Sequence, residues 1–146
     1  MKRTSKEFFE NYYETINNSR GNYDEREALR LRLFKEWYDE MEVGDHCNIK
    51  CWSDVEPCTI IKRTATTITV RHDKAERRPD WKPEWIPGGF AGYCTNNEDQ
   101  ENAWTITEDP NGYVETFRWS KRLNAYKNAA DEKLYPGWRK FYDYNF

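Results

Sequence analysis

The sequence predicts an α+β domain, in which two N-terminal helices precede a small, strongly bent antiparallel sheet of SH3-like type. Three observations predict this fold. Large apolar residues recur at helical spacing before residue 42, and they alternate with polar residues after Gly44. A long Pro-, Gly- and Trp-rich loop then separates the first strands from a C-terminal hairpin. At 146 residues we expect one domain, helical over 1–42 and mainly β over 43–146.

Both helices are predicted from rows of large side chains at i+4 spacing. A Thr-Ser-Lys-Glu segment at 4–7 fits a capping box at the start of the first helix. The row of that helix contains Phe8, Tyr12 and Ile16. A polar break at 17–21 precedes the second helix, predicted over about 24–41, whose row contains Leu29, Leu33, Trp37 and Met41.

Three strands are predicted over 46–52, 57–62 and 66–71, where β-branched and alternating residues follow a Val-Gly-Asp entry. The loop at 73–100 follows them. Two further β segments, 104–108 and 113–119, flank an Asp-Pro-Asn-Gly segment that is typical of a hairpin turn. The expected order is therefore two helices, three strands, a loop and a hairpin.

Composition indicates an interior built largely from rings. Only 37% of residues are hydrophobic, yet 16% are aromatic, a content that is unusual for a disordered chain. Aromatic side chains also predominate at protein interfaces, so any rings left outside the core would mark a binding surface.

The charge balance argues against two classes of function. The formal net charge is −3, and 11 of the 26 acidic residues but only 8 of the 23 basic ones precede His46. A dedicated binder of duplex DNA usually carries a basic surplus. A DNA mimic needs a much denser negative charge than this chain has.

The location expected from the sequence is cytoplasmic. The N-terminus has no apolar run of the kind that follows the basic start of a secretory signal, and no run of 18 apolar residues is present. In such a compartment cysteines stay reduced, and clustered cysteines more often bind metal than form disulfides.

The four cysteines are candidate ligands of one structural zinc ion. Cys51 and Cys58 flank a turn, and a hairpin would place their Cβ atoms about 5 Å apart, which suits two thiolates on one zinc. Cys94 would complete the site from the long loop, with Cys47, His46 or His72 as the fourth ligand. The alternative is that the cysteines are small buried apolar residues.

No catalytic motif stands out, and we expect a protein that is not an enzyme. The chain has two histidines, and it lacks a nucleophile elbow, a phosphate-binding glycine loop and a zincin helix. Cys94 with His72 is the one nucleophile and base pair to consider, and nothing near either residue in the sequence supports it.

Aromatic residues with basic neighbours are the candidate partner-binding residues. They fall in two groups, one on the long loop and one near the C-terminus: Arg77, Arg78, Trp81, Lys82 and Trp85, and Trp138 with Arg139. Such groups form protein-binding hot spots or stack on single-stranded bases. The alternative is that the rings complete the core while the charges remain in water.

Several motifs resemble a family of small uncharacterised proteins from phages and integrative elements of Gram-positive bacteria. They are Asp-Lys-Ala at 73–75, Pro-Glu-Trp-Ile-Pro-Gly-Gly-Phe-Ala-Gly-Tyr-Cys-Thr-Asn-Asn at 83–97, Asp-Pro-Asn-Gly at 109–112, Phe-Arg-Trp-Ser at 117–120 and the terminal Phe-Tyr-Asp-Tyr-Asn-Phe. The resemblance covers about residues 43–146, so the helical N-terminal third looks like a separate addition. Tyr93 departs from the histidine that this pattern would place before Cys94.

The resemblance implies an accessory protein of a mobile element, and such proteins often counter host defence. Some type II-A anti-CRISPR proteins of this size block the RNA-guided nuclease by binding it. The leading hypothesis is therefore a non-catalytic inhibitor that contacts a host nuclease. The alternatives are a zinc-stabilised barrel that binds single-stranded nucleic acid, and a phage metabolic enzyme that uses Cys94.

Overall fold

The fold is that of a computed structural model, which describes residues 5–88 and 92–145. The predicted capping residue Thr4 lies outside the described residues. So do residues 89–91 and Phe146, which belong to the motifs that carry the family resemblance.

Two N-terminal helices are present as predicted, α1 (Ser5–Asn17) and α2 (Tyr23–Glu40). Asn22 caps α2, because its side-chain oxygen accepts a hydrogen bond from the backbone N–H of Glu25 at 2.9 Å. The helices form a hairpin, and five residues of the predicted rows are buried: Phe8, Tyr12, Leu33, Trp37 and, just after α2, Met41. Neither described helix is long and apolar enough to cross a membrane.

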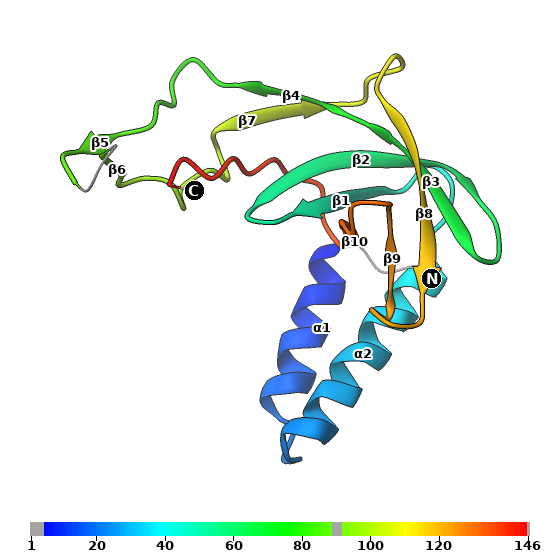
Figure 1. Cartoon of the computed structure of the whole chain (residues 1–146). Coiled ribbons are helices and arrows are strands. Elements are labelled where there is room, and N and C mark those ends of the chain that lie inside the picture. The colour runs from blue at the N-terminus through cyan, green and yellow to red at the C-terminus, as the bar shows by residue number, and fades with distance from the viewer. Residues whose placement is uncertain (1–4, 89–91, 146) are drawn as a thin grey trace.

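The predicted bent sheet closes into a six-stranded antiparallel barrel (Figure 1). Around the barrel the order is β1, β10, β9, β8, β3 and β2, and β2 then pairs with β1. The strands are β1 (His46–Cys51), β2 (Asp54–Arg63), β3 (Thr67–His72), β8 (Val114–Ser120), β9 (Ala125–Lys127) and β10 (Lys133–Tyr135). Closure removes the exposed edges that an open sheet would present.

Alternate residues of the barrel strands fill its interior. Ile60, Val70 and Phe117 are fully buried there, and the side chains of α2 join the same core. The Tyr38 hydroxyl donates to the Leu134 carbonyl at 2.8 Å. The Arg63 guanidinium donates to two carbonyls at the end of α2. The helical hairpin is therefore part of the same packed unit as the barrel.

A long two-stranded arm leaves the barrel between β3 and β8 (Figure 1). Its first part pairs β4 (Lys74–Arg77) with β7 (Trp104–Thr107), and its far part pairs β5 (Trp85–Ile86) with β6 (Tyr93–Cys94). The loop that the sequence predicts at 73–100 is thus mostly the arm.

The predicted C-terminal hairpin between 104–108 and 113–119 is wrong. Its two segments become β7 and β8, which do not pair with each other but pair with β4 and β3 respectively. The Asp-Pro-Asn-Gly segment forms a local turn, in which the Gly112 N–H donates to the Asp109 carbonyl at 3.0 Å. A single residue separates β3 from β4, so their partners β8 and β7 also follow one another in the same direction. The turn at 109–112 joins β7 to β8 without reversing the chain into a hairpin.

Candidate protein-binding site on the arm

The far end of the arm carries a cluster of exposed large side chains. Trp85 and Ile86 on β5 are 51% and 50% exposed, and Tyr93 on β6 is 53% exposed. Ile86 and Tyr93 are direct cross-strand partners and share one face, whereas Trp85, the neighbour of Ile86 on β5, lies on the other face of the same two-stranded element. We call Trp85, Ile86 and Tyr93 the arm tip.

The C-terminal segment holds the arm through amide side chains that act like peptide groups. Gln100 donates from its Nε2 to the Tyr142 carbonyl at 2.6 Å and accepts from the Tyr142 N–H at 3.0 Å. Asn145 accepts from the Cys94 N–H at 2.7 Å and donates to the Cys94 carbonyl at 3.0 Å. These paired bonds attach the last residues to the arm as a strand ladder would.

A further amide and a ring brace the base of the tip. Asn96 accepts from the Glu84 N–H and donates to the Lys82 carbonyl, each at 2.8 Å. The Tyr144 ring lies edge-on to Trp85, with centroids 6.1 Å apart. The arm tip is therefore presented on a braced support, which lowers the entropy that binding would cost.

Four of the five predicted partner-binding residues of the loop are exposed, and one is buried. Arg77, Arg78, Lys82 and Trp85 are exposed on the arm, as the binding hypothesis requires. Trp81 is only 9% exposed, and its indole N–H donates to the Asp99 carbonyl at 2.7 Å. For Trp81, the alternative of a ring that completes a core describes its position better.

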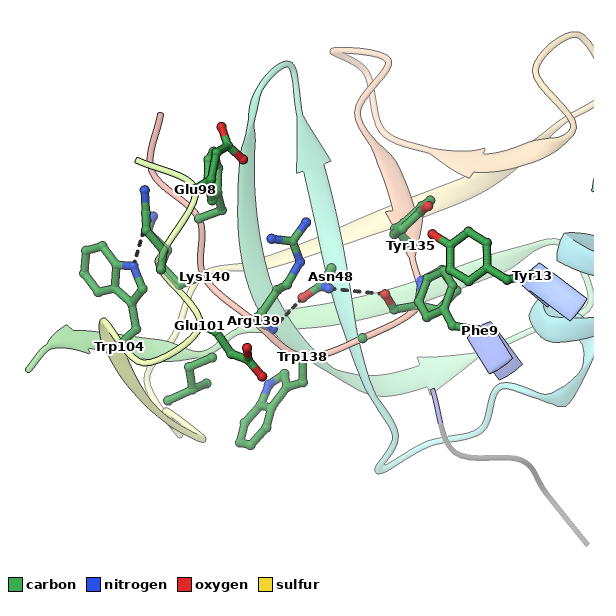
Figure 2. Close-up of a pocket in the computed structure, with 15 residues that line it drawn as sticks. Phe9, Tyr13, Asn48, Glu98, Glu101, Trp104, Tyr135, Trp138, Arg139 and Lys140 are labelled. Carbon is green, nitrogen blue, oxygen red and sulfur yellow. Dashed lines mark hydrogen bonds between the residues drawn. The ribbon is translucent and has the colours of Figure 1, made fainter. Parts of the chain in front are cut away.

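The second predicted group, Trp138 and Arg139, lies away from the arm tip, beside a hollow of about 790 Å³ (Figure 2). Trp138 stacks on His46 with centroids 3.8 Å apart and donates from its indole N–H to Asp73 at 2.8 Å. Arg139 is exposed, and its backbone N–H donates to the buried Asn48 side chain at 2.8 Å. The Trp138 ring therefore fixes the C-terminal segment to the barrel.

The hollow itself lies between α1, the barrel and the arm. Figure 2 shows Phe9, Tyr13 and Tyr135 at one end and Trp104 at the other. Aromatic rings and charged side chains of both signs line the hollow, the charged ones being Glu98, Glu101, Arg139 and Lys140. This lining resembles the rim of a protein interface more than a closed small-molecule site, which is mainly apolar.

The cysteines pair differently from the prediction. A two-residue turn at 52–53 places Cys51 opposite Asp54, and Cys58 then lies opposite Cys47 rather than Cys51. The sulfur atoms of Cys47 and Cys58 are 3.2 Å apart in the barrel core. Their hydrogen bond, followed by burial, raises the pKa of Cys58 well above its usual value.

Cys94 lies on β6 in the arm and not in the barrel core with that pair. Its thiol contacts the side-chain oxygen of Asn96 at 3.3 Å. Within residues 5–88 and 92–145 no three His, Cys, Asp or Glu side chains are grouped so that they could hold a metal ion. Zinc stays a prediction, which elemental analysis of protein purified without added metal would test.

The two candidate catalytic residues lie on different parts of the fold. His72 ends β3 in the barrel, and its Nε2 lies 2.5 Å from a carboxylate oxygen of Glu115. Cys94, the proposed nucleophile, lies on the arm beside the C-terminal segment. The structure does not assemble the Cys–His pair that the enzyme hypothesis needs.

No protein-family model, no curated protein and no solved structure matches this chain.

Ile86 and Tyr93 are the binding candidates that the sequence analysis missed. Both lie within the motif at 83–97, but neither has a basic neighbour, which was the signal used. A better signal was the Pro and Gly content around them, because two short strands flanked by such residues cannot build a core that buries their side chains.

Proposed function

We propose that this chain is a non-catalytic binding protein that docks on another protein through the arm tip. The observation that carries the proposal is the exposure of Trp85, Ile86 and Tyr93 together on one braced two-stranded element. Tryptophan and tyrosine are enriched among binding hot spots, and clustered exposed apolar groups of this kind mark interaction sites.

The charges around the arm tip support a polar rim. Arg77, Arg78 and Lys82 are exposed along the arm, and so are the acidic residues Asp80 and Glu84. A centre of rings within a polar, solvent-accessible rim is the usual anatomy of a protein interface. A partner with an apolar hollow and polar groups of both charges around it would fit this surface best.

The identity of the partner rests on the family resemblance. That resemblance proposes a host defence nuclease, namely the RNA-guided nuclease of a type II-A CRISPR system, as the protein that is bound and inhibited. The arm is part of the region that carries the resemblance, whereas α1 and α2 are not.

A binding measurement with matched variants tests the proposal. We expect Trp85→Ala with Tyr93→Ala to weaken binding to the purified nuclease–guide complex by about 30-fold or more, as for hot-spot aromatics. Tyr23→Ala is the control, because this ring is also exposed but lies on α2. Wild-type affinity of the double variant, or equal loss in the control, would contradict the assignment of the site.

If the nuclease does not bind, capture with the wild-type protein and the arm-tip variant from a host lysate separates the site from the partner. A protein retained by the wild type and lost from the variant would support the arm tip and reject the nuclease. Retention of the same proteins by both would reject the arm tip.

A further inference from the structure

Four basic residues lie side by side around the outside of the barrel. Lys50 on β1 is the direct partner of Lys133 on β10, Lys133 is the partner of Lys127 on β9, and Lys127 is the partner of Arg118 on β8. We call these four residues the basic belt. It crosses four neighbouring strands, which is a length of roughly 14 Å at the usual strand spacing.

The belt points away from the core. The inward positions next to it are occupied by Ile49, Leu134, Tyr126 and Phe117, which are all buried. Lys50, Lys133 and Arg118 are exposed, and Lys127 is half-buried. Like charges that lie directly opposite on neighbouring strands destabilise a sheet. Asp131 offsets the charge of Lys127, and the Lys50 ammonium lies 5.4 Å from the centre of the Tyr135 ring. The charges of Lys133 and Arg118 have no such partner among the described residues, and an anionic ligand would offset them.

The acidic residues near the belt are mostly engaged with other groups. Asp131 binds Lys127 at 2.7 Å and also binds Arg122 at 3.3 Å. Glu115 accepts from Asn128 and contacts His72, and Glu132 also accepts from Asn128. Within the described residues, no ion pair involves Lys50, Lys133 or Arg118.

Hydroxyl groups continue the belt on the same outer face. Thr67 is the cross-strand partner of Arg118, and Thr116 and Ser120 flank Arg118 at the positions two residues away on β8. Arginine, lysine, serine and threonine are among the side chains that contact backbone phosphates in nucleic acids. Lysine, in contrast, is depleted at protein–protein interfaces, and the belt contains three lysines.

One exposed ring accompanies the belt. Trp52 follows Lys50 by two residues in the turn between β1 and β2, and its side chain is 87% exposed. Its φ of 54° lies in the left-handed region, which a bulky residue rarely adopts. A costly backbone conformation that presents a bare indole points to a binding role, and an indole face stacks on unpaired bases of any sequence.

We propose that the basic belt and Trp52 bind single-stranded nucleic acid without sequence preference, with the belt on the phosphates and the indole on a base. This site is separate from the arm tip, so its test does not depend on the proposed protein partner. It also differs from the sequence-based alternative, which placed nucleic-acid binding on the basic and aromatic residues of the loop.

Fluorescence anisotropy with a labelled 20-nucleotide single strand of mixed sequence tests the proposal. Four phosphate contacts predict a slope of about −2.8 for the logarithm of the association constant against the logarithm of salt concentration. We expect Lys133→Gln with Arg118→Gln to reduce affinity about tenfold or more at low salt and to make the slope shallower by about 1.4.

The matched control removes two charges elsewhere. Lys74→Gln with Arg20→Gln changes the net charge equally, at exposed positions outside the belt. Equal weakening in the control would overturn the proposal, because the attraction would then depend on overall charge. Circular dichroism and thermal unfolding check that each variant is folded. The belt variant should be at least as stable as the wild type, since it relieves repulsion.

Trp52→Ala separates a single strand from other polyanions. Loss of one stacked base predicts at least fivefold weaker binding to the single strand and little change with a duplex of the same sequence. Equal binding of duplex and single strand, with no effect of Trp52→Ala, would overturn the proposal. So would equally tight binding of polyglutamate, or no binding at about 100 µM protein, the weak limit for nonspecific nucleic-acid binding.

Discussion

The barrel and the arm achieve order by different means. The barrel buries aliphatic and aromatic side chains, with Ile60, Val70 and Phe117 fully inside. The arm buries few apolar groups, and two of its buried residues are the amides Asn97 and Gln100. Its order depends on hydrogen bonds between these amides and the backbone of the C-terminal segment: Gln100 donates to the Tyr142 carbonyl, and both amide oxygens accept from backbone N–H groups.

This difference implies that the two regions can be weakened separately. Hydrophobic burial is distributed over many contacts, so the barrel with its two helices should unfold cooperatively. The arm relies on a few hydrogen bonds, each of which leaves a buried polar group unsatisfied when its partner is removed. We therefore expect the arm to open while the barrel stays folded.

The largest expected effect is in the barrel core. Phe117→Ala should lower the free energy of unfolding by about 3–5 kcal/mol, because it removes a fully buried ring and leaves a cavity. Urea denaturation followed by circular dichroism measures this change. The adjacent outward residue provides the control, since Thr116→Ala should cost less than about 1 kcal/mol. A similar loss in both variants would contradict the assignment of Phe117 to the core.

A smaller and more local effect is expected in the arm. Gln100→Ala removes both bonds to Tyr142 and the acceptor of the Trp104 indole N–H at 3.1 Å. We expect the opening free energy of the C-terminal segment to fall by about 1–3 kcal/mol. Hydrogen exchange should then speed up at the Tyr142 and Tyr144 amides.

The control for this variant is Glu101→Ala, an exposed neighbour that makes none of these bonds. The barrel amide of Ile60, which donates to the Asp45 carbonyl, should keep its exchange rate in both variants. Faster exchange of Ile60 in Gln100→Ala would show that barrel and arm open as one unit.

Sequence patterns predicted the barrel side of this comparison better than the arm side. The rows at i+4 and the alternating strands are local signals, because burial of one helix or strand face repeats along the chain. Closure of the sheet into a barrel, in contrast, depends on pairing between strands that are distant in the sequence. It depends on β10 (Lys133–Tyr135) reaching β1, and three residues carry too little pattern to predict a strand.

The arm was misread because its partners are distant in sequence. Turn chemistry at 109–112 indicated a reversal of the chain, but the pairing of β7 was decided by β4, some thirty residues earlier. The hydrogen bonds of Gln100 and Asn145 connect positions 42 and 51 residues apart, and amide residues have no spacing that announces such contacts. For the same reason the sequence left open whether Trp81 completes a core or binds a partner.

The comparison extends to pH, and the barrel should weaken first at alkaline pH. Burial, followed by a hydrogen bond to Glu132, raises the pKa of Cys51 from 9.0 to about 12. A thiol with a raised pKa stabilises the folded state fully below pH 9, and this contribution is lost as pH rises toward 12.

We therefore expect the urea midpoint to fall between pH 9 and pH 11, and Cys51→Ala to reduce that fall. Cys94→Ala, a change on the arm, serves as the control and should leave the alkaline dependence of the barrel unchanged. Equal pH profiles for the wild type and Cys51→Ala would contradict the role assigned to this thiol.

The smallest expected effect is an acid-induced loosening of the arm. The Asn145 backbone N–H donates to the Asp143 carboxylate at 3.0 Å and, as the main cause, lowers the pKa of that carboxyl below 3.8. A carboxylate with a lowered pKa stabilises the folded state above its usual pKa, and this contribution is lost as pH falls through the lowered value. Hydrogen exchange at the Tyr144 amide should therefore gain an extra acid dependence that the Ile60 amide lacks.

Two variants test this prediction. Asp143→Asn keeps an acceptor but cannot titrate, so it should remove the extra acid dependence, whereas Asp80→Asn on the exposed side of the arm should not. If the extra acid dependence survives in Asp143→Asn, another group controls the attachment of the C-terminal segment.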